Sequence, residues 1–398
     1  MIQEKMRVGN VEIANRVVIQ PMEGCDCLEN GAPSELTVNK YLSFAKSGAG
    51  IIWFEACAVC KEGRTNVRQM NINEGNVDAF TNLLKDIRGA ATDAGFPAPK
   101  LILQLTHSGR QSIVPMIAYR NEVYEAKRPM KDEYIVSDEY LDTLPEKFAK
   151  AAQLAVAAGF DGIDMKSCHG YLLQELLSAY NREGKYGGSF ENRTRCYLQC
   201  FDAIKAVVPK DFILAARIGL SDMVQKPFGF GTDEQGNLDL TEAKRFVQIL
   251  TERGLKLLNV TIGNPYFNPH INRPFRVGPY KAPESAETGL KRFYDVEKEM
   301  KKTFPDLPIV GSGVSYYKND LMEQAEKLLC DGACDFVGFG RNAIAYPEFY
   351  VDYLAGKFDG KKCCVTCSKC TTLMRNGCVS GCATFNEYYK DLFKREKL

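Results

Sequence analysis

Three proton-bearing side chains stand close together after one short apolar run. Lys166, His169 and Tyr171 fall within six residues at the end of the run Gly162–Lys166. A single histidine is more often a hydrogen-bonded core residue than a catalyst, but three donors at one strand end favour acid or electrophilic chemistry. Arg217 ends a later apolar run and adds a permanent cation, and a buried arginine needs an anionic partner.

Two further apolar runs end in glycine-bearing turns. The first turn contains Gly311, Ser312 and Gly313, and the second contains Gly340 and Arg341. Glycines let backbone N–H groups approach a phosphate closely, and an arginine can bind it bidentately. Each turn alone is also compatible with an ordinary strand–helix connection, but together they predict a phosphate site.

A glutamine ends another run. Gln104 has both a donor and an acceptor on its side chain, which is the complement of a pyrimidine edge. A glutamine in this place is often only solvated, so the residue alone is weak support for a binding site.

Cysteines cluster near the end of the chain. The sequence has 15 cysteines, and six of them lie between Cys363 and Cys382. Cys364, Cys367, Cys370 and Cys382 are separated by two, two and eleven residues. Two short spacings and one distant partner suit a [4Fe–4S] cluster, and a structural zinc site or free thiols are the alternatives.

Eight short β-rich runs, each followed by a helical stretch, must position these residues. They are Val17–Pro21, Ile51–Glu55, Leu101–Leu105, Gly162–Lys166, Phe212–Ile218, Lys256–Ile262, Pro308–Gly311 and Asp335–Gly338. Runs that are apolar on successive residues suit parallel strands covered by helices. Eight such units predict an α/β fold, a TIM (β/α)₈ barrel, with a doubly wound sheet as the alternative.

Two long connections and the tail complete the predicted organisation. The segments from Thr106 to about Leu144 and from Gly263 to Gly289 follow predicted strands, so in a barrel both open onto the face where active sites lie. Helices are predicted at Thr241–Gly254 and Asn319–Leu329. We expect a barrel over residues 1–358 and a cysteine-rich tail over 359–398.

Five motifs are informative together: Asn15–Val18 with Pro21 and Met22, Gln104–Arg110, His169–Leu172, Tyr186–Arg193 and Gly340–Arg341. They resemble the motifs of the old yellow enzyme family of FMN-dependent ene-reductases. The motifs occur in the family's order between about residues 5 and 350, and Tyr186–Arg193 is highly specific. The chain resembles most the subgroup of dienoyl-CoA reductase and trimethylamine dehydrogenase.

The resemblance implies how FMN and substrate would bind at the barrel mouth. Gln104 would face the pyrimidine edge of the flavin, and Arg217 would lie near N1 and O2. Pro21, Met22 and Glu23 would lie against the ring, and the phosphate would be held by Gly311, Ser312, Gly313, Gly340 and Arg341. Lys166 and His169 would hold the substrate oxygen, hydride would pass from flavin N5 to the β-carbon, and Tyr171 would protonate the α-carbon.

The sequence departs from the family pattern at two positions. Lys166 stands where the family usually has histidine, and a lysine favours a carboxylate or a strongly polarised carbonyl oxygen. Glu23 stands where threonine or cysteine commonly contacts flavin O4, and an anion there disfavours reduced flavin unless it is protonated or turned away. Cys25 is the alternative for that contact.

The resemblance also bears on the electron supply. In the subgroup, a similarly placed cluster relays electrons from a C-terminal flavin and nicotinamide domain. This sequence ends at Leu398 without such a domain, so we expect electrons to come from a partner protein or from NAD(P)H directly.

Composition sets the remaining expectations. The formal charge of +1 gives no reason to expect nucleic acid or a membrane as partner, and the polar start of the chain predicts a cytoplasmic protein. The expected substrate is a small unsaturated carbonyl or carboxylate compound. The alternatives are an oxidative dehydrogenase or demethylase like trimethylamine dehydrogenase, and an electron-transfer subunit, which would not need an acid.

Overall fold

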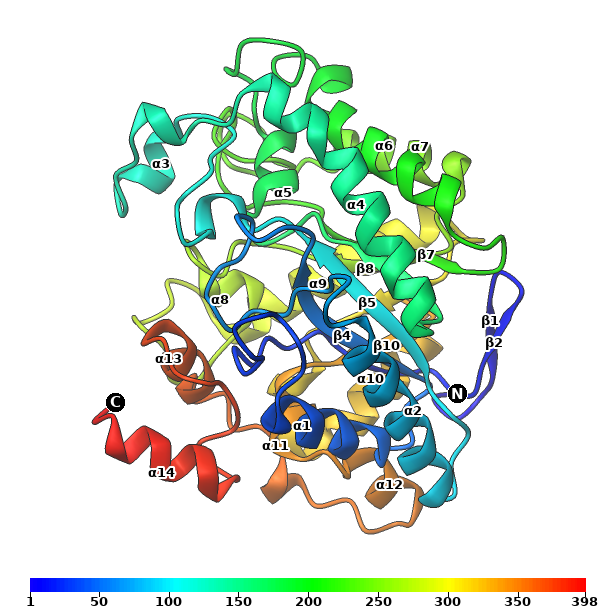
Figure 1. Cartoon of the computed structure of the whole chain (residues 1–398). Helices are drawn as coiled ribbons and strands as arrows, with labels where there is room; N and C mark the ends of the chain where they lie inside the picture. Colours follow the sequence, from blue (N-terminus) through cyan, green and yellow to red (C-terminus); the bar gives the residue numbers. More distant parts are fainter.

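Eight parallel strands close into a barrel at the centre of the molecule (Figure 1). The structure is a computed structural model that describes residues 1–398. The strands are β3 (Val17–Ile19), β4 (Ile51–Ala58), β5 (Lys100–Thr106), β6 (Gly162–Met165), β7 (Ile213–Gly219), β8 (Leu257–Thr261), β9 (Ile309–Gly311) and β10 (Phe336–Phe339). They follow in chain order, and β10 pairs with β3 to close the ring. The predicted TIM barrel is confirmed.

An apolar cluster fills the interior of the barrel. It consists of 11 buried residues, among them Trp53 of β4 and Phe336 of β10. Val8 and Ile13 belong to the same cluster, and they come from a hairpin formed by β1 (Met6–Val8) and β2 (Val11–Ile13). This hairpin, which the sequence pattern did not predict, therefore covers one end of the barrel and leaves the other end for the site.

Helices surround the barrel and bury a larger apolar cluster of 82 residues between themselves and the strands. The long helices are α1 (Glu35–Ala45), α2 (Val77–Asp93), α4 (Asp138–Ala158), α6 (Phe190–Val207), α7 (Thr241–Arg253), α9 (Ala286–Thr303) and α10 (Leu321–Cys330). The short ones are α3 (Glu122–Glu125), α5 (Leu172–Leu177), α8 (Pro269–Asn272), α11 (Arg341–Ala345) and α12 (Phe349–Leu354). The two helices predicted from periodicity correspond to α7 and α10.

The two long connections follow β5 and β8, as predicted. The first one is shorter than the sequence indicated, because α4 begins at Asp138 rather than after Leu144. Ser137 caps this helix: its hydroxyl accepts a hydrogen bond from the backbone N–H of Tyr140 at 3.2 Å. A serine cap of this kind starts a helix upstream of the apolar pattern that reveals it.

The tail lies on the side of the barrel opposite the N-terminal hairpin (Figure 1). It contains α13 (Lys369–Arg375) and α14 (Glu387–Arg395), which share a small apolar cluster of their own. Backbone hydrogen bonding ties the tail to the barrel, since the Ser380 N–H donates to the Gly24 carbonyl at 2.6 Å. Every helix of the molecule is too short or too polar to cross a membrane.

Candidate active site

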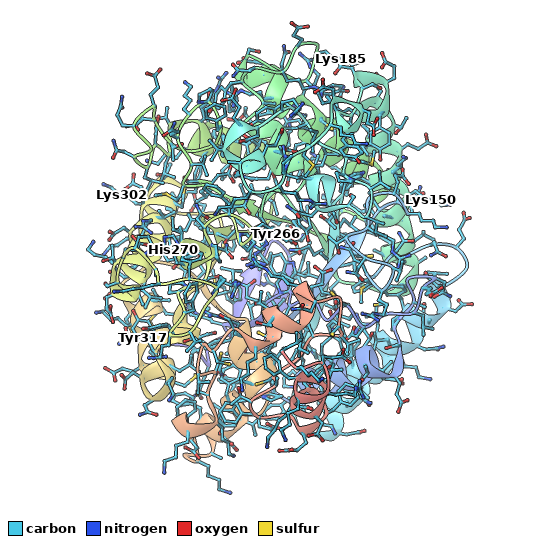
Figure 2. All side chains as sticks on the ribbon, turned by 90° about the vertical axis from the view of Figure 1, so that its left-hand side faces the viewer. Lys150, Lys185, Tyr266, His270, Lys302 and Tyr317 are labelled. Atoms are coloured by element: carbon cyan, nitrogen blue, oxygen red, sulfur yellow. The ribbon has the colours of Figure 1, made fainter.

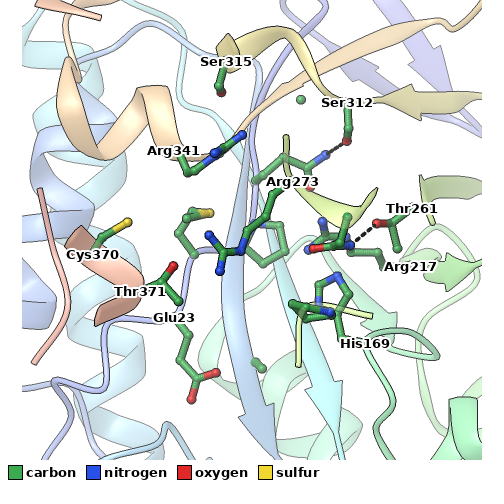
Figure 3. A pocket seen from close by; sticks show the side chains of 18 of the residues that line it. Glu23, His169, Arg217, Thr261, Arg273, Ser312, Ser315, Arg341, Cys370 and Thr371 are labelled. Carbon is green, nitrogen blue, oxygen red and sulfur yellow. Dashed lines mark hydrogen bonds between the residues drawn. The ribbon is translucent and has the colours of Figure 1, made fainter. Parts of the chain in front are cut away.

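A cavity of about 220 Å³ opens where the barrel strands end. Figure 2 looks onto this side of the molecule, with Tyr266 near the middle of the view. Figure 3 shows part of the wall, to which Arg217 of β7 and segments following β3, β6, β8, β9 and β10 contribute. The same wall includes Cys370 and Thr371 of α13, so the tail forms one of its sides.

The cavity brings together most of the residues singled out from the sequence. Its wall includes Pro21, Met22, Glu23, Gln104, Lys166, His169, Tyr171, Arg217, Ser312, Gly313, Gly340 and Arg341. Gly311 lies outside the wall. A Cβ atom at Gly311 would approach Cys334 Sγ and Glu297 Oε2 to 2.8 Å, so glycine is required there for packing.

The three proton-bearing residues follow β6 directly. Lys166 Nζ lies 3.6 Å from the centre of the Tyr171 ring, and the Tyr171 hydroxyl lies 3.5 Å from that of Tyr266. His169 adopts a left-handed backbone conformation with φ of 66°, and its Nε2 atom is buried without a hydrogen-bond partner. A buried ring nitrogen without a partner is costly, so this atom is available to a ligand.

Burial sets the protonation of this group. It lowers the pKa of His169 well below its usual value, and the Arg217 and Lys166 charges lower it further, so the imidazole is neutral at pH 7. Burial also lowers the pKa of Lys166. Burial raises the pKa of Tyr171 well above its usual value, so the phenol keeps its proton. The cavity thus holds one neutral imidazole and one phenol that can act as an acid.

Gln104 is oriented by a buried carboxylate that the sequence reasoning did not single out. Its Nε2 atom donates to Asp164 Oδ2 at 2.6 Å, and the indole N–H of Trp53 donates to the same oxygen at 2.9 Å. The other oxygen of Asp164 accepts the backbone N–H of Arg217 at 2.5 Å. Asp164 therefore fixes both the glutamine and the strand that carries the arginine. The sequence signal that could have identified Asp164 is a carboxylate placed between apolar residues in the run that forms β6.

The predicted phosphate site lies where β9 and β10 end. The Ser312 N–H donates to Glu297 Oε1 at 2.6 Å, and Gln20 Nε2 donates to the Ser312 hydroxyl at 3.1 Å. Gly313 has φ of 97°, a conformation that favours glycine. Arg341 Nη1 donates to the Pro274 carbonyl at 3.0 Å and has no carboxylate partner. Arg217 also lacks one, and its Nε atom is buried without a hydrogen bond.

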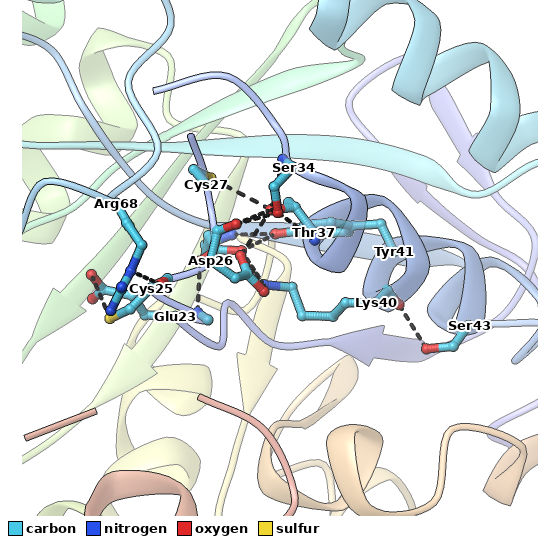
Figure 4. A network of polar contacts seen from close by, with 12 residues as sticks. Glu23, Cys25, Asp26, Cys27, Ser34, Thr37, Lys40, Tyr41, Ser43 and Arg68 are labelled. Carbon is cyan, nitrogen blue, oxygen red and sulfur yellow. Dashed lines mark hydrogen bonds and ion pairs between the residues drawn. The ribbon is translucent and has the colours of Figure 1, made fainter. Parts of the chain in front are cut away.

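Glu23 reaches the wall beside a buried polar network (Figure 4). Its Oε1 atom accepts a hydrogen bond from the Thr65 hydroxyl at 3.0 Å. Burial raises the pKa of Glu23, and the Lys166 charge opposes that rise. Cys25, the alternative flavin contact, is buried outside the wall, with its sulfur 3.9 Å from Glu23 Oε1.

A second cavity, of about 20 Å³, is lined by Cys364, Cys367, Cys370 and Cys382. Cys370 lines both cavities, so the sulfur cavity adjoins the larger one. Cys363 instead belongs to the apolar cluster of 82 residues between the helices and the strands. No three His, Cys, Asp or Glu side chains in the structure are grouped closely enough to hold a metal ion.

The chain is similar to a known protein family over most of its length. The model of the NADH:flavin oxidoreductase / NADH oxidase family matches residues 4–354. An NADH oxidase of Thermoanaerobacter brockii is 28% identical over 385 residues, which cover 94% of this chain and 53% of that protein. A cinnamate reductase of Clostridium sporogenes is 25% identical over 407 residues, which cover 96% of this chain and 57% of that protein.

Among solved structures, a complex of 2-naphthoyl-CoA reductase superposes with a TM-score of 0.79 at 19% identity. The match covers 96% of this chain and 56% of that one. At this identity the likeness concerns the fold. The chain spans about half the length of these three relatives.

Proposed function

The chain belongs to the NADH:flavin oxidoreductase / NADH oxidase family, and on that premise we propose that it is an ene-reductase of the old yellow enzyme type. The family resemblance seen in the sequence motifs is confirmed, and the chain is a flavin-dependent oxidoreductase. The proposed reaction adds a hydride to the β-carbon and a proton to the α-carbon of an unsaturated carbonyl or carboxylate compound. The convergence of Lys166, His169 and Tyr171 on one cavity carries this proposal.

The cavity fits FMN at both ends. Arg217 Nε lacks a hydrogen-bond partner where the resemblance places the flavin N1 and O2 atoms, and a reduced flavin would supply the missing anion. At the other end, Arg341 and the turn at Ser312 and Gly313 would hold the phosphate. A Cβ atom at Gly340 would approach Met22 Sδ to 3.0 Å, so the glycine keeps this corner open. When bound, FMN supplies the hydride.

The side chains after β6 would activate the substrate. Lys166 and the neutral His169 donate hydrogen bonds to the substrate oxygen, and this polarises the conjugated double bond. His169 Nε2 has no partner in the structure and is therefore free for that bond. Tyr171 donates its proton to the α-carbon, and the Tyr266 hydroxyl lies 3.5 Å from the phenol oxygen.

We also propose that Cys364, Cys367, Cys370 and Cys382 hold a [4Fe–4S] cluster. The support is that all four thiols line one cavity and that Cys370 borders the flavin cavity as well. The four thiols are not grouped as ligands of one metal ion, and in a [4Fe–4S] cluster each cysteine would bind a different iron. Such a cluster supplies single-electron transfer. The electron donor would be NADH, which the family's name states, NADPH or a reduced partner protein.

The test of the function is an anaerobic oxidation of the reduced holoenzyme. Purified protein should release FMN, and an enone or enoate should reoxidise the dithionite-reduced flavin with formation of the saturated product. Release of FAD, or the lack of flavin in folded protein, would contradict the cofactor assignment. Reduction of the oxidised enzyme by amines, with no reoxidation by any enone or enoate, would favour the dehydrogenase alternative instead.

A further inference from the structure

The active-site cavity contains more positive charge than the proposed chemistry uses. Its wall has six basic side chains and one carboxylate, that of Glu23. The basic residues are Lys40, Lys166, Arg217, Arg273, Arg341 and Arg375. Gathering like charges in a partly buried cavity is unfavourable unless anions bind there.

Four of the six cations have a partner or a proposed role. Lys40 forms an ion pair with Asp26 at 2.9 Å (Figure 4) and another with Glu55 at 2.6 Å. Lys166 contacts the substrate oxygen in the proposed reaction, and Arg217 and Arg341 serve FMN. Arg273 and Arg375 remain.

Neither remaining arginine forms an ion pair. Arg273 Nη1 lies 3.5 Å from the Ser368 hydroxyl, and its Nη2 atom is buried without a hydrogen bond. Arg375 is exposed at the mouth, where its Nη2 atom donates to the Pro265 carbonyl at 2.6 Å. The nearby Arg341 and Arg375 charges add to burial in lowering the pKa of Arg273 to about 10. An oxyanion between the two guanidinium groups would relieve this repulsion.

Both arginines lie on the substrate side of the cavity. Arg375 binds the carbonyl of Pro265, the neighbour of Tyr266, and the Tyr266 hydroxyl contacts that of Tyr171. Arg273 is close enough to His169 for its charge to contribute to the lowered pKa of that imidazole. In Figure 3, Arg273 projects into the cavity between Glu23 and Arg341.

We propose that Arg273 and Arg375 form an oxyanion subsite for the substrate. The enzyme would then act on compounds that carry a carboxylate or phosphate in addition to the oxygen held by Lys166 and His169. A guanidinium group binds either oxyanion through two parallel hydrogen bonds. Arg375 lies on α13, so the tail that carries the cysteines also takes part in substrate selection. This inference rests on the proposed function for the placement of the reacting double bond.

The test compares binding of matched neutral and anionic probes to the oxidised holoenzyme. The probes are an enone with a remote carboxylate, its methyl ester, and the corresponding phosphate monoester. Oxidised enzyme does not consume them, so dissociation constants follow from titration calorimetry whether or not the enone is a substrate. We expect wild-type enzyme to bind at least one of the anions about 10-fold or more tightly than the ester.

The variants Arg375→Met and Arg273→Met should remove the preference for the anionic probes over the ester and leave the affinity for the ester unchanged. Arg375→Lys should retain part of it. Arg395→Met is the matched control, because this residue lies on α14 with its side chain 73% exposed, and we expect the preference to remain. FMN and iron contents are measured for every variant.

Two results would overturn the subsite. One is equal affinity of wild-type enzyme for the ester and both anions. The other is that the arginine variants lose FMN or iron but still prefer the anionic probes. That result would show that the two arginines bind a cofactor and not the substrate. A tight, charge-selective interaction without any enone reduction would leave the subsite standing and refute the ene-reductase proposal alone.

Discussion

The buried carboxyl group of Glu297 offers a quantitative test of the phosphate turn. Glu297 lies on α9, and its Oε1 atom accepts the Ser312 N–H at 2.6 Å, while Oε2 has no partner. Burial raises the pKa of Glu297 to about 8, and the Ser312 hydrogen bond opposes this rise only in part. At pH 7 the side chain is therefore neutral, which avoids placing an anion behind the turn proposed to bind phosphate.

The effect on stability follows from the two pKa values. The rise in the pKa of Glu297 from the ordinary value of 4.5 to about 8 corresponds to a contribution of about 5 kcal/mol to the free energy of unfolding. Because the folded protein holds the proton more tightly than the unfolded chain, this contribution is complete below about pH 4.5. It falls by about 1.4 kcal/mol per pH unit and is lost as the pH passes about 8.

The perturbation is Glu297→Gln, which keeps the acceptor for Ser312 and cannot ionise. Urea unfolding of both proteins, at equal FMN concentration, gives the free energy of unfolding between pH 5 and pH 8. Between pH 5 and pH 8, we expect the free energy of unfolding of the variant to rise by about 4 kcal/mol relative to that of the wild type. Other buried carboxyl groups that titrate here, such as Asp222 with a pKa raised to about 6, are common to both proteins and cancel.

Glu299→Gln is the control on the same helix. Its carboxylate forms a 2.5 Å ion pair with Lys244 at the surface, and that lysine lowers the pKa of Glu299. We therefore expect Glu299→Gln to leave the fall in unfolding free energy between pH 5 and pH 8 as it is in the wild type. Parallel stability curves for wild type and Glu297→Gln would refute the reasoning, because they would show that Glu297 is ionised in the folded protein.

The remaining predictions concern the proposed reaction and the tail. Tyr171→Phe should leave FMN binding and flavin reduction intact but slow reoxidation by substrate about 10²–10⁴-fold in stopped-flow measurements; an unchanged rate would mean that the proton comes from another group. Lys166→Met should weaken substrate binding and rate together, whereas Lys166→His should keep measurable turnover; wild-type kinetics in Lys166→Met would remove the role of the lysine. Cys367→Ser should lose iron but keep FMN, as measured by metal and flavin analysis of anaerobic protein; stoichiometric zinc and no iron in the wild type would overturn the cluster assignment.

The sequence predicted the barrel well because its strands are buried on both faces. All eight positions of β4 are buried, for example, and the resulting apolar run is visible without any structure. The N-terminal hairpin escaped prediction because each of its strands has three residues, too few to establish an alternating pattern. The start of α4 was placed too late because its first residues, Asp138 and Glu139, are polar and carry no apolar periodicity.

The site was predictable where a residue stood directly at the end of a strand. Lys166 and Arg217 are of this kind, because barrel strands deliver their carboxyl ends to one face. Asp164 was not singled out, since its role depends on Gln104, which lies 60 residues away in the chain. Arg273 and Arg375 belong to a connection and to the tail, and no local pattern shows that they share a wall.

The tail shows why a motif's spacing gives an incomplete account of what a segment does. Cysteine spacing points to a metal cluster, and it treats the residues between the cysteines as spacers. In the structure, α13 turns Cys370 toward both cavities, while Thr371, Met374 and Arg375 line the larger one. We therefore expect that loss of the proposed cluster would disturb substrate binding as well as electron supply. Activity with dithionite alone cannot separate the two effects, so the Cys367→Ser variant needs a binding measurement with the carboxylate and ester probes.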